Sequence, residues 1–82
     1  MATFEQATTA KETFKKTYWK PNPDIFNIIT INEQYILDEN EDIIGEEFNI
    51  KVYLFDINNA KDFPSDIDGV EIVYLPVVVK DV

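Results

Sequence analysis

The sequence predicts an α+β fold in which an N-terminal helix packs on a small three-stranded sheet, in the order helix, strand, strand, short helix, strand. Three observations predict it: a helical apolar stripe in the first 20 residues, a strictly alternating strand near the middle, and a β-branched segment near the C-terminus. The 82 residues are enough for one domain, which we expect to span 1–82.

The helix is expected to begin after Thr3, because Thr3 followed by Gln6 matches a capping box. Pro21 and Pro23 are expected to end it, since proline lacks an amide donor and disfavours helical geometry in the preceding residue. The stripe that should face the sheet consists of Phe4, Ala7, Ala10, Phe14 and Tyr18.

A first strand is predicted over residues 25–31, with a possible extension over 33–37, because the segment is rich in β-branched residues. The two-residue period places its apolar side chains on both faces. We expect Ile29 and Ile31 on one face, and Phe26 and Ile28 on the other.

The second strand, residues 48–55, is the clearest in the chain and is expected at the middle of the sheet. The acidic segment 38–42 should form the long tip of an antiparallel hairpin that joins it to the first strand. Its core face should consist of Phe48, Ile50, Val52 and Leu54.

A third strand is predicted over residues 70–79, with Pro76 inside it. Proline cannot donate to a ladder, so this strand should lie at a sheet edge or be bulged at Pro76. The preceding link, residues 56–69, is long enough for a crossover and a parallel pair, and an antiparallel meander is the alternative. Within this link we expect one helical turn and a second turn at 66–69.

The net charge of −9 is unevenly distributed along the chain. Residues 1–20 carry four lysines against two glutamates, whereas residues 21–82 carry three lysines against fourteen carboxylates. Such an acidic surface repels nucleic acid and anionic lipid, so neither is expected as a partner. The lack of cysteine, of a signal pattern and of a long apolar run predicts a cytoplasmic protein.

The residues that usually carry catalysis are missing from the sequence. It contains no histidine and no cysteine, and its one serine, Ser65, lies in a predicted turn. With two glycines in the whole chain there is no phosphate-binding loop either. We therefore expect a protein that is not an enzyme and has no cofactor.

Two acidic groups were considered as metal sites. Asp38, Asn40 and Asp42 have the spacing of the first ligands of a calcium loop, but Ile43 stands where that loop needs glycine. We therefore expect these residues to form a solvated hairpin tip instead of a calcium site. The other group, Asp62, Asp66 and Asp68, is expected to form turns. No metal site is predicted.

Aromatic side chains on the far face of the second strand suggest an interaction surface. Three strands and one helix cannot cover both faces of a sheet, so one face should remain open to a partner or to a second copy. The alternative is that the aromatics line the rim of the helix-covered face. The candidate residues are Tyr53 and Phe55, together with Tyr74 and Trp19.

The segment 64–72, PSDIDGVEI, preceded by NIITI at 27–31 and IKVYL at 50–54, resembles a small bacterial domain of unassigned function. That domain occurs alone or ahead of trypsin-like peptidase domains. The resemblance covers about residues 24–74, implies the same order of helix and strands, and carries over no catalytic residue. Ile29 and Ile31 stand where the domain has glycines.

Three functions are consistent with these observations. The first is a small interaction module that binds another protein or forms a homo-oligomer through its sheet. The second is an acidic mimic of nucleic acid that inhibits a basic DNA- or RNA-binding protein. The third is a weak divalent-cation-binding domain.

Overall fold

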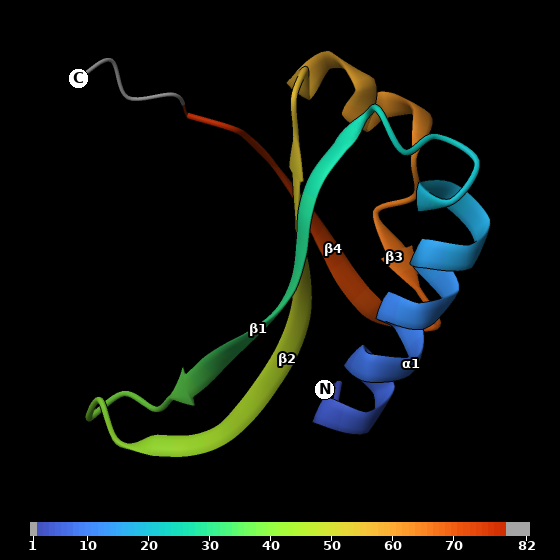
Figure 1. Ribbon diagram of the computed structural model, residues 1–82. Helices are drawn as coiled ribbons and strands as arrows, with labels where there is room; N and C mark the ends of the chain where they lie inside the picture. Colours follow the sequence, from blue (N-terminus) through green and yellow to red (C-terminus); the bar gives the residue numbers. More distant parts are fainter. Residues whose placement is uncertain (1, 79–82) are drawn as a thin grey trace.

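The computed structural model describes residues 2–78 and shows helix α1 packed across one face of a mixed four-stranded sheet with strand order β1-β2-β4-β3 (Figure 1). The α+β class is therefore confirmed. The predicted count of three strands is corrected to four, because residues 66–67, predicted to be part of a turn, form the short strand β3.

Helix α1, Phe4–Phe14, begins where the capping box predicts. The Gln6 amide donates to the Thr3 hydroxyl at 3.1 Å, and the Thr3 amide donates to the Gln6 side chain at 2.8 Å. The chain continues as one π-helical turn, η1 (Lys15–Trp19), which the sequence did not predict. The helical path then ends before Pro21, as expected.

Strands β1 (Phe26–Leu37) and β2 (Ile43–Leu54) form the predicted antiparallel hairpin and are both longer than expected. The predicted faces of β1 are wrong at its start. A register shift between Phe26 and Ile28 inserts an extra residue, so Phe26 joins Ile29 in the core while Ile28 is 49% exposed. The bulge resets the two-residue alternation on which the prediction relied.

Strand β2 is the central strand of the core, as predicted. Its core-facing residues Ile50, Val52 and Leu54 have no exposed surface. On one side it pairs with β1, and on the other it pairs in parallel with β4 (Val70–Pro76), in a register that places Ile50 beside Ile72. The link between them contains the short 3-10 helix η2 (Ile57–Asp62), so the crossover alternative is the one observed.

Strand β3 (Asp66–Ile67) forms a tight antiparallel hairpin with the start of β4. The two loop residues, Asp68 and Gly69, have φ angles of 50° and 83°. Two consecutive left-handed residues match a type I′ turn, for which Asp-Gly is a favoured sequence. A turn is therefore present as predicted, but it comprises only Asp68 and Gly69, and the residues on either side of it pair as β3 and β4.

Pro76 lies at an open edge of the sheet, which is one of the two predicted alternatives. The Ile72 amide donates to the Ser65 carbonyl on one side of β4, and the Val77 amide donates to the Leu54 carbonyl on the other. Backbone groups alternate in direction along a strand, so residue 76 directs its backbone toward the same side as Ile72. Strand β3 does not extend that far along β4, so no amide donor is needed on this side at position 76, and proline is tolerated. Val79, the last residue of the predicted strand, lies outside the described residues.

An aromatic cluster fills the space between α1 and the sheet. Phe14 is fully buried and contacts Phe26 and Tyr18 at ring-centroid distances of 5.3 Å. Phe63 and Tyr74 complete the cluster, each 6.4 Å from Phe14. Ala7 and Ala10 let the helix approach the sheet closely, because they are small and fully or almost fully buried.

An alanine substitution at Ile50 tests the position of this core. We expect Ile50→Ala to lower the free energy of unfolding by about 2–5 kcal/mol, because it removes a fully buried side chain from the central strand. Ile28→Ala, the same change at a half-exposed position, should lower it by less than about 1 kcal/mol. Urea denaturation measures both. Equal losses at the two positions would contradict the assigned faces.

Candidate functional site

The far half of the β1–β2 hairpin extends beyond the helix as a curved arm (Figure 1). The Cα radius of gyration is 14.3 Å, whereas a compact domain of this length has about 12 Å. The accessible surface is 5860 Å², roughly 800 Å² more than the about 5,050 Å² expected for a folded monomer of 9.5 kDa. The protein is therefore more extended than a compact domain of its length, and the projecting arm contributes to this (Figure 1).

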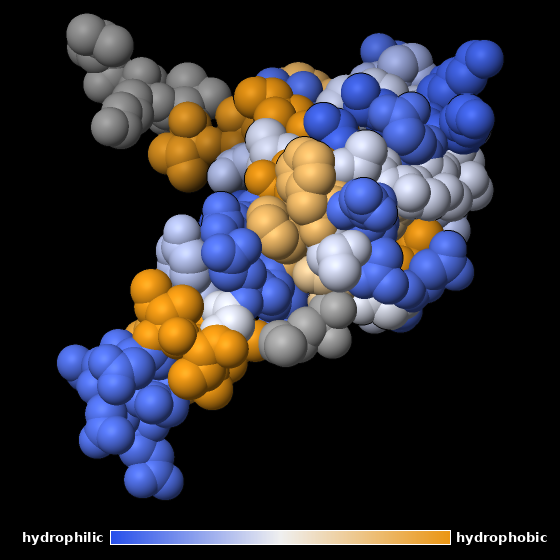
Figure 2. Space-filling view, turned by 90° about the horizontal axis from the view of Figure 1, so that it is seen from below, coloured by the Kyte–Doolittle hydropathy of each residue, from blue (hydrophilic) through white to orange (hydrophobic). Residues whose placement is uncertain are grey.

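Large apolar side chains cluster on this arm. Figure 2 shows orange side chains on it, directly next to its blue tip. We call the cluster the arm patch. Its four residues are Tyr35, Leu37, Ile43 and Ile44, which are 55%, 53%, 62% and 64% exposed. Contiguous exposed apolar surface of this kind marks interaction sites in soluble proteins.

Strand pairing brings the arm patch together. Leu37 of β1 lies opposite Ile43 of β2, and Ile36 lies opposite Gly45, which leaves Ile44 as the extra residue of a bulge. Tyr35, two positions before Leu37, projects from the same face by strand alternation. The patch thus continues the helix-facing side of the sheet past the point where the helix begins.

The tip of the arm, residues 38–42, is held by Asp38. Its Oδ1 atom accepts hydrogen bonds from the amides of Asn40 at 2.8 Å and Asp42 at 3.0 Å. Glu41 has a left-handed φ of 65°, which closes the turn. The Asp38 carboxylate is therefore engaged in turn formation, and the tip presents four negative charges in five residues.

The carboxylates of the arm shift the titration of Tyr35. The pKa of Tyr35 is raised above its ordinary value, chiefly by the negative charge of Glu33 and also by Glu46, its cross-strand neighbour. A carboxylate disfavours ionisation of a nearby phenol. Tyr35 combines a polar hydroxyl with an apolar ring, as do many aromatic residues at protein interfaces.

The four aromatics selected from the sequence do not form one surface. Tyr74 faces the helix, and its hydroxyl donates to the Pro64 carbonyl at 2.6 Å, while burial raises its pKa. Trp19 stacks on Phe26 at 5.2 Å. Tyr53 is half-buried on the opposite face, and Phe55, just beyond β2, is 60% exposed.

The arm patch was missed at the sequence level because its residues are ordinary strand formers. The available signal was the pair of apolar segments on either side of the acidic tip, residues 35–37 and 43–44. Segments placed so symmetrically about a turn pair with each other. The sequence does not show that α1 is too short to cover them.

A buried polar side chain lies beside the arm. Asn49 is only 2% exposed, and neither atom of its amide group has a hydrogen-bond partner within residues 2–78. In the register it lies opposite Asn32 of β1. Among residues 2–78, Asn49 is thus a buried polar side chain whose amide has no compensating hydrogen bond.

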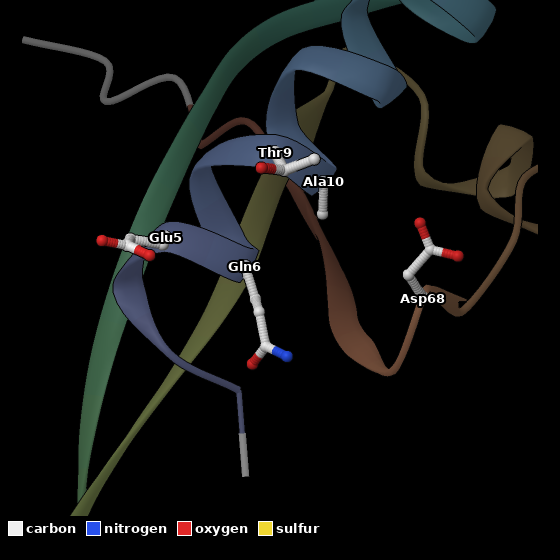
Figure 3. A pocket seen from close by; sticks show the side chains of 5 residues that line it. All are labelled: Glu5, Gln6, Thr9, Ala10 and Asp68. Atoms are coloured by element: carbon white, nitrogen blue, oxygen red, sulfur yellow. The ribbon is translucent and has the colours of Figure 1, made fainter.

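A shallow hollow of about 300 Å³ lies between α1 and the β3–β4 turn (Figure 3). Its lining residues are Glu5, Gln6, Thr9, Ala10 and Asp68. Gln6 is already engaged in the helix cap. The remaining polar groups are the carboxylates of Glu5 and Asp68 and the hydroxyl of Thr9, with no imidazole, thiol or amine side chain among the lining residues.

Within the described residues, no three acidic side chains are placed to hold a metal ion, and no helix is long and apolar enough to cross a membrane. The chain matches no protein-family model, no curated protein and no solved structure. The geometry of the arm is therefore the main guide to function.

A titration of Tyr35 tests the arrangement of charges on the arm. We expect Glu33→Gln to lower the pKa of Tyr35 toward its ordinary value, because the substitution removes the nearest negative charge. Glu47→Gln is the control, since Glu47 lies opposite Gln34 and does not contribute to the shift. NMR of the tyrosine ring across the pH range measures both variants. An unchanged pKa in Glu33→Gln would show that the two side chains are apart.

Proposed function

We propose that this protein is a small non-enzymatic interaction module that self-associates through the arm patch. The observation that supports the proposal best is the exposure of Tyr35, Leu37, Ile43 and Ile44 side by side on a projecting hairpin. A cytoplasmic location belongs to the same proposal, since a chain without cysteine folds without oxidation.

A second copy is the occupant that the charge distribution favours. The acidic tip of residues 38–42 sits next to the arm patch, and the same chain carries a compensating cluster of lysines at 15, 16 and 20. Each molecule thus carries both an acidic segment and a basic segment, which could pair with each other across an interface between two copies. An inhibitor that imitates nucleic acid would use the tip alone and has no use for the apolar patch beside it.

Sedimentation of the purified protein over a range of concentrations tests the proposal. We expect the native chain to form a dimer and the double variant Leu37→Lys, Ile43→Lys to be monomeric. Two buried charges on each side of a symmetric interface should weaken association at least about a hundredfold. Both positions are exposed in the monomer, so the variant should keep its fold, which circular dichroism checks.

The control variant is Ser65→Lys, Val78→Lys, which places the same two charges at exposed positions on the β3–β4 side of the sheet, away from the arm and from β1. We expect it to dimerise like the native chain. A native chain that stays monomeric at high concentration would contradict the proposal. Dissociation by the control alone would instead assign the interface to the β3–β4 side of the sheet.

A further inference from the structure

Strand β1 forms an unprotected edge of the sheet. It is 12 residues long and has no partner on its outer side within the described residues. Its only charge is Glu33, and it contains neither lysine nor proline. The opposite edge is protected by β3 and by Pro76. Natural proteins usually protect long edges in these ways, because unpaired backbone groups recruit other strands.

The hydrogen bonds of β2 identify which backbone groups lie free on this edge. The Phe48 amide donates to Ala2, and the Leu54 carbonyl accepts from Val77, so these residues direct their backbone groups away from β1. In an antiparallel pair, two residues that lie opposite each other either both direct their backbone groups toward each other or both direct them away from each other. The partners of Phe48, Ile50 and Val52 therefore point to the open edge; they are Glu33, Ile31 and Ile29.

We propose that two copies pair antiparallel through their β1 edges about a two-fold axis near Ile31, so that the arm of each copy lies against η1 of the other. This inference rests on the proposed self-association and adds its geometry. An axis near Ile31 lies at the middle of β1, which pairs the largest number of residues. An axis at Ile31 also places Glu33 of one copy opposite Ile29 of the other. An axis at Glu33 would instead place the two Glu33 carboxylates opposite each other, which is unfavourable.

The register carries the arm patch to an apolar part of the second copy. Counting outward from Ile31, Leu37 of one copy reaches the region of Ile25 of the other. The ring of Trp19 lies there, stacked on Phe26 and only partly buried. A two-fold axis perpendicular to the sheet keeps the helix-facing sides of both copies on one side. The arm patch therefore meets the rim of the aromatic cluster, where its exposed side chains lose water.

Charge complementarity supports the same placement. Beyond Leu37 the acidic tip, residues 38–42, continues past the region of residues 20–24 in the second copy. The adjacent η1 segment of that copy carries Lys15 and Lys16 and is followed by Lys20. Four carboxylates thus approach three lysines at each end of the dimer, although the whole chain has a charge of −9.

A charge-swap experiment tests this geometry. The first variant is Lys15→Glu, Lys16→Glu and the second is Glu39→Lys, Glu41→Lys; all four side chains are exposed. The first variant alone sets a charge of −1 on Lys15, Lys16 and Lys20 against −4 on the tip, and the second removes the net charge of the tip, so we expect the association of each to be at least about tenfold weaker than that of the native chain. Mixed in equal amounts, the two variants should dimerise again. One end of the mixed dimer keeps the native charges, and at the other end the introduced lysines of one variant face the introduced glutamates of the other.

The control is Asp66→Lys, Glu71→Lys, which shifts the net charge from −9 to −5 as the second variant does, but at two exposed positions on the opposite edge of the sheet. It should dimerise normally. If the native chain dimerises and the mixture stays monomeric, or if each variant alone dimerises as tightly as the native chain, the geometry is overturned while the proposed self-association stands. If the native chain is a monomer, both proposals fail.

Discussion

The structure depends on the pairing of β1 with β2. The inner half of this hairpin presents Ile50, Val52 and Leu54 to the helix, and α1, β4 and η2 all contact it, whereas β3 joins the sheet through β4. Helix α1 covers its core face, β4 adds along the free side of β2, and η2 spans the crossover between them. In a domain of 82 residues without disulfides, this one sheet must organise nearly all of the buried apolar surface.

The same hairpin continues where nothing in the described chain covers it. The arm adds no burial to the core, so its apolar side chains are not explained by the stability of the monomer. The acidic tip keeps the exposed arm hydrated and soluble. One half of the hairpin thus organises the core, and the other half exposes apolar side chains.

Local chemistry made part of this structure predictable. The capping box at Thr3, the prolines after η1 and the alternation of residues 48–54 each act over a few residues, and each prediction is confirmed. The bulge after Phe26, the pairing of β3 and the inward position of Tyr74 depend on neighbours distant in sequence. The arm patch belongs to this second class, because its exposure follows from the length of α1 relative to β1 and β2.

The most direct test is the exchange of backbone amides at the β1 edge, measured by NMR at low and high protein concentration. We predict that the amides of Ile29, Ile31 and Glu33 exchange rapidly in dilute solution and become protected as the concentration rises. The amide of Tyr74, on the open side of β4, should exchange at the same rate throughout. Exchange at Ile31 that is independent of concentration would contradict the pairing of two copies through this strand.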